Sequence, residues 1–71
     1  VRLVFKIALE QNAVAIVLAH NHPSGKLQAS EADIQVTKRI KNAGLQLDIS
    51  VLDHIIVTEH SYFSFADEGI L

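Results

Sequence analysis

The pattern of apolar and polar positions divides the chain into two amphipathic segments and several short apolar runs. The first segment predicts an amphipathic helix over residues 2–11 that ends at Asn12. Its apolar positions recur at i, i+4, i+7 and i+8, which is one face of a helix: Val1, Phe5, Ala8 and Leu9.

Residues 13–19, "AVAIVLA", are apolar on both faces and include β-branched side chains. The run is too short for a core helix, so it predicts a strand that is covered on both sides. The next residues are typical of a turn: Asn21, Pro23, Ser24 and Gly25.

Ser30 is placed to cap a second helix, because its side chain can accept from the backbone N–H three residues on and Asp33 can reach back. We expect this helix to extend to about Ala43, with Gly44 as a left-handed stop. Its apolar stripe is Val36, Ile40 and Ala43.

Three more strands are predicted, over residues 47–52, 54–58 and 62–66. A helix between two strands usually forms a parallel crossover. The fold class is therefore α/β, with helices layered on a mixed sheet.

Composition limits the classes of function. The 71 residues are 49% apolar with a net charge of −2, and the six basic residues are spread out, so we expect no direct nucleic-acid binding and no strong phosphate-binding surface. No apolar run reaches membrane-spanning length, and the start is not a signal peptide. The lack of cysteine fits a reducing compartment, and we expect the cytoplasm.

Two histidines lie at the end of the predicted buried strand. In an extended chain His20 and His22 point the same way, and a short loop can bring Asp33, in the first turn of the next helix, to the same point. Two imidazoles and a carboxylate suit a catalytic zinc ion, which keeps a fourth position for water. Ser30, one turn before Asp33, is placed to stabilise an oxyanion.

The same residues have a purely structural interpretation. An isolated H-x-H is weak evidence for a metal, Ser30 with Asp33 is also a plain capping box, and Pro-Ser-Gly is ordinary turn chemistry. The conjunction of these features favours the metal site, and a serine that caps a helix can still face a substrate.

The other polar and aromatic candidates have weaker support. His54 is either a group beside the metal, or an extra ligand, or a histidine at a strand start bonded to the backbone, and we favour the last. We assign no role to His60. Phe63 and Phe65 should be core residues, with Tyr62 on the opposite face.

The histidine segment carries a family resemblance. His20-Asn21-His22, seven residues, then Ser30-x-x-Asp33 resembles the H-x-H-x7-S-x-x-D signature of the JAMM (JAB/MPN) metalloproteases. The stretches "VLAHNHPSG", "SEADIQVTKRIKNAG", "VLDHIIV" and "SYFSFADEGIL" resemble the C-terminal JAB-type domain of the bacterial RadC family over nearly the whole chain.

This resemblance implies a cytidine-deaminase-like α/β/α fold with a mixed sheet. It implies His20, His22 and Asp33 as ligands of Zn²⁺, and Ser30 as the hydroxyl that stabilises the oxyanion. It also implies a zinc-dependent hydrolase that attacks an amide or isopeptide carbonyl of a peptide or protein substrate.

The sequence departs from the family in lacking the upstream glutamate that acts as general acid/base. Glu10, the only acid before His20, is at the end of a predicted helix, so we do not assign it that role. We therefore expect residues 1–71 to be a partial domain that hydrolyses nothing alone. Its unpaired sheet edge favours a homodimer or strand exchange.

A second hypothesis is a non-catalytic scaffold or interaction module, in a family that has long carried a DNA-repair label. Inactive JAMM-like domains typically lose the metal set, and this chain retains it. That feature favours the hydrolase.

Overall fold

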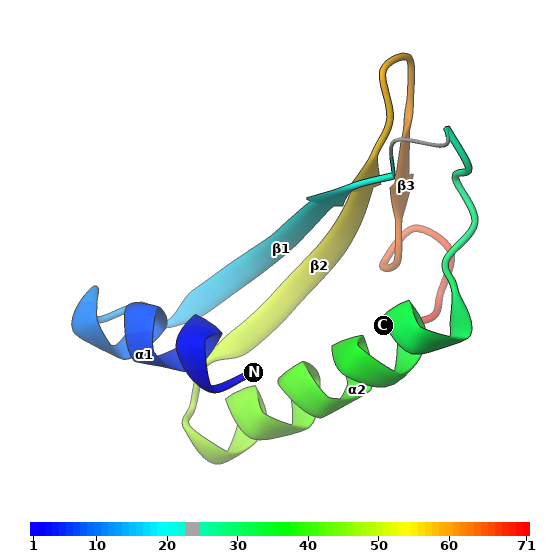
Figure 1. Ribbon diagram of the computed structural model, residues 1–71. Coiled ribbons are helices and arrows are strands. Elements are labelled where there is room, and N and C mark those ends of the chain that lie inside the picture. The colour runs from blue at the N-terminus through cyan, green and yellow to red at the C-terminus, as the bar shows by residue number, and fades with distance from the viewer. Residues whose placement is uncertain (23–24) are drawn as a thin grey trace.

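The computed structural model describes residues 1–22 and 25–71 (Figure 1), so the predicted turn residues Pro23 and Ser24 lie outside the described part. The sheet has the order β1-β2-β3, with β1 parallel and β3 antiparallel to β2. The mixed sheet and the parallel crossover are thus confirmed. The elements are α1 (Arg2–Glu10), β1 (Ala15–Asn21), α2 (Glu31–Gln46), β2 (Ser50–Val57) and β3 (Tyr62–Ser64).

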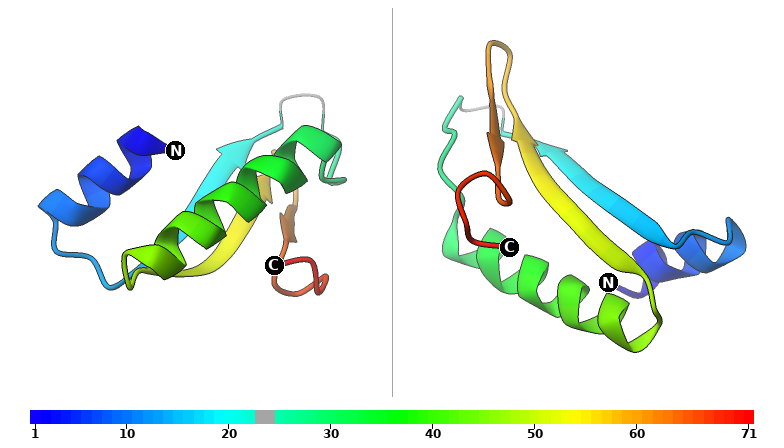
Figure 2. Two further views of the ribbon diagram at one scale, coloured as in Figure 1. Left: turned by 90° about the horizontal axis from the view of Figure 1, so that it is seen from below. Right: turned by 180° about the vertical axis from the view of Figure 1, so that it is seen from behind.

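Both helices pack on the same side of the sheet (Figure 2). Phe5 of α1 and Ile40 of α2 belong to one buried cluster, which Ile16 and Leu18 of β1 join from the sheet. The opposite face carries no helix among residues 1–22 and 25–71, and Val17 remains 54% exposed there. The described residues therefore form two layers, whereas the sequence predicted three.

The predicted end of the first helix is confirmed. Asn12 has a left-handed φ of 54°, and the following N–H, of Ala13, donates to Ala8 O. Asparagine tolerates this conformation better than most residues, which explains why the helix ends here.

The second helix differs from the prediction at its end and on its buried face. It extends beyond Gly44 to Gln46, and the left-handed residue is Asp48, with φ 57°. The buried positions are Thr37, Ile40 and Gly44, while Val36 is 42% exposed. Glycine is needed at position 44 because the carbonyl oxygen of Ile49 occupies the place of a side chain.

The two strands predicted on either side of Asp53 are one continuous strand with a bulge. Ile16 pairs with Val51 and the next residue, Val17, pairs with Asp53, so Leu52 is the extra residue. The bulge lets Val51 and His54, which have odd spacing, both face the helices. It therefore aims His54 toward β1 and α2.

The third strand is shorter than predicted, and a turn follows it. Phe65 is fully buried beyond the strand, while Tyr62 is 62% exposed, as expected for the opposite face. In the described residues, neither helix has the length and apolar character needed to span a membrane.

Candidate metal site

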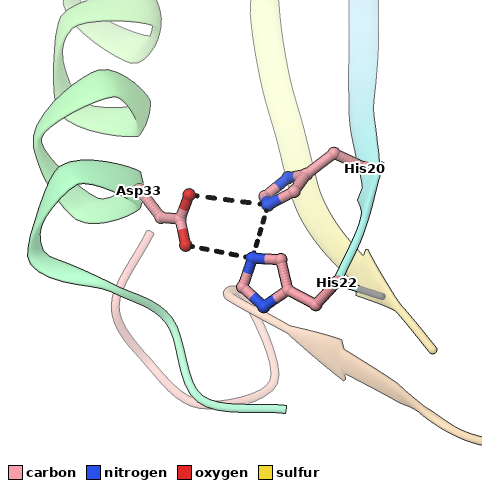
Figure 3. A group of neighbouring side chains, drawn as sticks. All are labelled: His20, His22 and Asp33. Atoms are coloured by element: carbon pink, nitrogen blue, oxygen red, sulfur yellow. Dashed lines mark hydrogen bonds and ion pairs between the residues drawn. The ribbon is translucent and has the colours of Figure 1, made fainter. Parts of the chain in front are cut away.

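Three side chains, from β1, from the residue just after it and from α2, converge at one end of the sheet (Figure 3). His20 Nε2 lies 3.5 Å from Asp33 Oδ1, and His22 Nε2 lies 3.4 Å from Asp33 Oδ2. The two Nε2 atoms are 2.9 Å apart. The structure thus brings together the three residues that the sequence predicted as metal ligands.

The two histidines reach this point because of the strand geometry. β1 ends later than predicted, so His20 belongs to the strand and faces the helices, as Leu18 does. The N–H of His22 donates to Val57 O at 3.1 Å, which continues the pairing with β2 just beyond the strand. The backbone of both histidines is therefore held by pairing with β2.

The third side chain is fixed by the capping box that begins α2. Ser30 Oγ accepts from the N–H of Asp33, and the N–H of Ser30 donates to Asp33 Oδ2, both at 3.0 Å. The predicted cap is confirmed. It also orients the Asp33 carboxylate, whose two oxygens then face the two histidines.

The charge of Asp33 is favoured by its surroundings. Partial burial acts to raise the pKa of its carboxyl group, but hydrogen bonds from Ser30 and the nearby His20 and His22 outweigh this and lower the pKa below 3.8. The side chain is 19% exposed. A carboxylate is thus present at neutral pH and still accessible.

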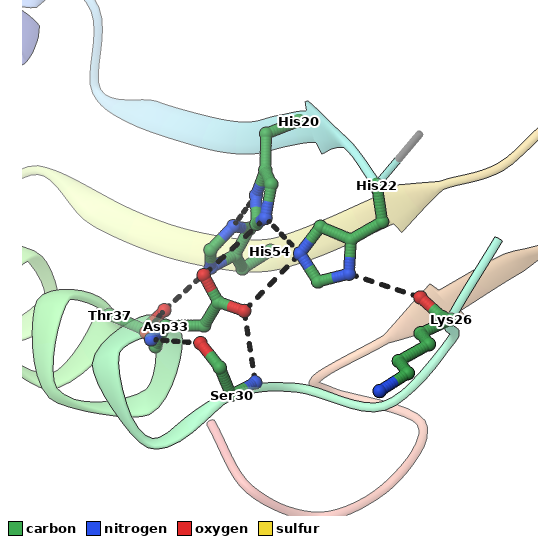
Figure 4. Close-up of polar contacts among 7 residues, drawn as sticks. All are labelled: His20, His22, Lys26, Ser30, Asp33, Thr37 and His54. Atoms are coloured by element: carbon green, nitrogen blue, oxygen red, sulfur yellow. Dashed lines mark hydrogen bonds and ion pairs between the residues drawn. The ribbon is translucent and has the colours of Figure 1, made fainter. Parts of the chain in front are cut away.

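Two further side chains, His54 and Thr37, continue the hydrogen bonding from the Nδ1 atom of His20, which faces away from the cluster (Figure 4). His20 Nδ1 lies 2.7 Å from His54 Nε2, and His54 Nδ1 contacts Thr37 Oγ1. Our preferred interpretation of His54, as a strand-start residue bonded to the backbone, is therefore wrong. The residue is 5% exposed, and its ring stacks on that of Phe65, with centroids 4.5 Å apart.

The environment of His54 favours its neutral form. Burial lowers the pKa of the imidazole below 6.5, and the neighbouring His20 lowers it further, against a smaller opposite effect of Asp33 and Asp53. A neutral imidazole has one donor and one acceptor nitrogen. This restricts the hydrogen bonds that His54 can make.

The donor set fits a small cation. Donor atoms bound to one zinc ion at about 2.0–2.1 Å, at tetrahedral angles, lie about 3.4 Å apart. The separations from Asp33 Oδ1 to His20 and from Asp33 Oδ2 to His22, 3.5 Å and 3.4 Å, are near this value, whereas the two Nε2 atoms, 2.9 Å apart, lie closer together than it. Imidazole nitrogen and carboxylate oxygen suit zinc, and they also suit other divalent transition metals.

The site is open to solvent on one side. A hollow of about 380 Å³ adjoins His22 and is bounded by Asn21, Val57 and Glu59. A smaller hollow of about 300 Å³ lies between His20 and α2. The first hollow is lined by His22, and the second by His20 and Asp33, so each of the three side chains borders one of them.

Other candidates lie elsewhere or were missed. Glu10 ends α1 and pairs with Lys6 at the surface, 3.9 Å away, so it contributes nothing to the cluster. His60 is 87% exposed. Thr37 was missed because a threonine within a helix has no signal that distinguishes it, and its partner His54 is 17 residues away.

Comparison with known proteins gives a consistent result. A family model described as "RadC-like JAB domain" matches residues 1–70. A UPF0758 protein of Flavobacterium johnsoniae is 60% identical over 70 residues, which cover 99% of this chain and 31% of that protein. A UPF0758 protein of Chlorobaculum tepidum is 50% identical over 70 residues, covering 99% and 32%.

A UPF0758 protein of Porphyromonas gingivalis is 50% identical over 72 residues, which cover 100% of this chain and 32% of that protein. The chain thus spans about a third of the length of the curated relatives it matches.

Proposed function

We propose, because this chain belongs to the family of RadC-like JAB domains, that His20, His22 and Asp33 hold a zinc ion used for hydrolysis. The observation that carries the proposal is the convergence of two imidazole nitrogens and a carboxylate oxygen within 4.8 Å. An ionised carboxylate can only accept hydrogen bonds. A bound cation would therefore offset the repulsion between the acceptor atoms that meet here.

The reaction class is attack of water on an amide or isopeptide carbonyl of a peptide or protein. Bound zinc would lower the pKa of a water molecule to about 7 and polarise the carbonyl. The two histidines contribute neutral nitrogen ligands, and Asp33 contributes the one negative charge of the set. A site with three protein ligands keeps a position open for chemistry.

Ser30 has a second use in this proposal. Its oxygen accepts from the N–H of Asp33, but its hydroxyl hydrogen remains able to donate, and the residue is exposed. A hydroxyl near the cluster could donate to a carbonyl oxygen that gains negative charge. Ser30 would thereby act both as helix cap and as catalytic donor.

The general acid/base is the part of the machinery that we assign to a residue outside these 71. In the described ranges, the group that could hold a metal contains no carboxylate except Asp33. Proton transfer usually needs a separate positioned group. We therefore expect the chain alone to bind zinc and to hydrolyse nothing.

The finer fold assignment is also a proposal. We expect a cytidine-deaminase-like JAB/MPN domain with α/β/α layers, in which further chain covers the open sheet face. Its support is the exposed apolar side chains on that face, such as Val17 and Leu52, and the one-third share of the relatives' length.

The experiment is zinc titration with a competing chelator, together with metal analysis, of the wild type, His22→Ala and His60→Ala. His22→Ala should weaken zinc binding by more than about 100-fold, because even supporting residues of metal ligands contribute about 10–100-fold. The exposed His60→Ala variant should bind like the wild type. Equal zinc content in the wild type and His22→Ala would refute the site.

A further inference from the structure

We propose that Thr37 and His54 are positioning residues that fix the tautomer of His20, so that its Nε2 lone pair faces His22 and Asp33. The inference rests on the proposed function in one respect, namely that a metal ion uses this lone pair. The hydrogen-bond chain itself follows from the geometry of the residues (Figure 4).

The series of hydrogen bonds begins at the backbone carbonyl oxygen of Asp33, which can only accept. The Thr37 hydroxyl donates to the backbone carbonyl oxygen of Asp33 at 2.7 Å. Because its single hydrogen is used there, Thr37 Oγ1 can only accept from His54. His54 Nδ1 must therefore carry the hydrogen in the contact between them.

The next step follows from the two nitrogens of the His54 ring. The residue is 5% exposed and its ring stacks on Phe65, and a neutral imidazole with its hydrogen on Nδ1 has the lone pair on Nε2. The carboxylate of the preceding residue, Asp53, is engaged by the N–H of His54 and the Ser64 hydroxyl. His54 Nε2 is consequently an acceptor.

The last step sets His20. Its Nδ1 lies 2.7 Å from the acceptor His54 Nε2 and so carries the hydrogen. The neutral imidazole then has its lone pair on Nε2, the atom that lies 3.5 Å from Asp33 Oδ1. Each donor in the series is determined by the one before it.

Asp33 takes part at both ends of this series of hydrogen bonds: its carbonyl oxygen accepts from Thr37, and its carboxylate lies beside His20 Nε2. Its carboxylate belongs to the candidate ligand set, while its carbonyl oxygen, one helical turn before Thr37, accepts the first hydrogen bond. The first turn of α2 therefore places one ligand and orients another. Hydrogen-bonded partners of metal ligands commonly have this orienting role.

His22 reaches the same tautomer by a different route. Its Nδ1 lies 3.0 Å from the backbone carbonyl oxygen of Lys26, so Nδ1 carries the hydrogen and Nε2 has the lone pair. The Nε2 atoms of His20 and His22, 2.9 Å apart, then both present lone pairs beside the Asp33 carboxylate, and a bound cation would relieve this contact between acceptors. A backbone acceptor survives any side-chain substitution. Variants of Thr37 should consequently disturb His20 and leave His22 unchanged.

The test compares Thr37→Val, which removes the hydroxyl and keeps the shape, with the matched control Thr37→Ser, which keeps the hydroxyl. Nitrogen-15 NMR of the zinc-free full chain, at about pH 8.5 where an ordinary imidazole is neutral, reports the tautomer of each histidine. We expect His20 to carry its hydrogen on Nδ1 in the wild type and in Thr37→Ser. In Thr37→Val this tautomer should lose its dominance, while His22 keeps its own.

Zinc affinity by chelator competition is the second measurement. Thr37→Val should bind zinc about 10–100-fold more weakly than the wild type, and Thr37→Ser within about twofold of it. A folded Thr37→Val with wild-type affinity would overturn the inference. So would a wild-type His20 with its hydrogen on Nε2, which remains decisive even if Thr37→Val does not fold.

The two proposals fail in different ways. If the wild type binds no zinc, the proposed function fails, and the NMR result alone decides whether Thr37 and His54 set the tautomer. If the wild type binds zinc and Thr37→Val changes neither measurement, the metal site stands and the positioning role is refuted.

Discussion

Asp53 Oδ2 accepts a hydrogen bond of 2.6 Å from the Ser64 hydroxyl, and this contact joins β2 to the end of β3. The other oxygen, Oδ1, accepts from the N–H groups of His54 and Ala66, at 2.7 Å and 3.0 Å. One carboxylate thus holds the segment that carries Phe65 against the ring of His54.

Removing this carboxylate should destabilise the fold. Asp53→Ala leaves the buried Ser64 hydroxyl and two N–H groups without their acceptor, so we expect the free energy of unfolding to fall by about 2 kcal/mol. Urea denaturation followed by circular dichroism measures the loss. The exposed Asp67→Ala is the control, with an expected change within about 0.5 kcal/mol. Equal losses in the two variants would contradict this account.

The same carboxylate should make stability depend on pH. Burial acts to raise the pKa of Asp53, but hydrogen bonds from Ser64, Ala66 and His54 outweigh it and lower the pKa below 3.8. A lowered pKa stabilises the fold fully above the unfolded value, and the contribution is lost as pH falls through the folded pKa. The stability difference between the wild type and Asp53→Asn should therefore shrink as pH falls below 3.8. A difference that stays constant across this range would argue against the lowered pKa.

Gly44 is required by packing and not by backbone conformation. A methyl group at this position would collide with the carbonyl oxygen of Ile49, in the turn that leads into β2. Gly44→Ala should therefore lower the free energy of unfolding by about 1–3 kcal/mol, although alanine favours helices. Asn42→Ala, at an exposed position of α2, should not destabilise the protein. A Gly44→Ala variant more stable than the wild type would contradict this prediction, because it would mean that the carbonyl oxygen of Ile49 can move aside.

The three candidate ligands could be found from the sequence because each is placed by local geometry. His20 and His22 are two residues apart at a strand end, and Asp33 is set by its cap with Ser30. The partners behind them depend on long-range contacts instead. His20 meets His54 across 34 residues, and only the register of β1 on β2 brings them together.

The errors in the predicted fold have a similar origin. Asp53 interrupts an apolar stretch and so suggested a break between strands, but its carboxylate is satisfied by Ser64 and by N–H groups within one bulged strand. The apolar run of residues 13–19 suggested cover on both faces. Composition does not reveal which segment supplies that cover, and here Val17 on the second face is exposed.

The open edge of the sheet, together with the exposed apolar side chains on its uncovered face, should cause self-association. β1 is an edge strand of the described sheet, and its neighbour Leu52 adds to the exposed apolar surface around Val17, at 57% and 54% exposed. Light scattering should give a mass above that of one chain at high concentration. Val17→Lys should lower the average mass, and Leu45→Lys, an equally apolar and exposed change on α2, should not. A wild-type mass equal to one chain would refute this prediction.

The two roles of Ser30 can be separated by substitution. Ser30→Ala removes the oxygen that caps α2, so the free energy of unfolding should fall by about 1 kcal/mol. Zinc affinity should change much less than in Asp33→Ala, because the Ser30 backbone N–H still donates to Asp33 Oδ2 in the alanine variant. Ser30→Asp supplies another capping oxygen and should recover the lost stability, although it lacks the hydroxyl donor. Urea denaturation and chelator competition on the same three variants test both statements. If Ser30→Ala loses zinc as completely as Asp33→Ala, then the Ser30 side chain belongs to the metal site itself, and the division of roles between cap and ligand is wrong.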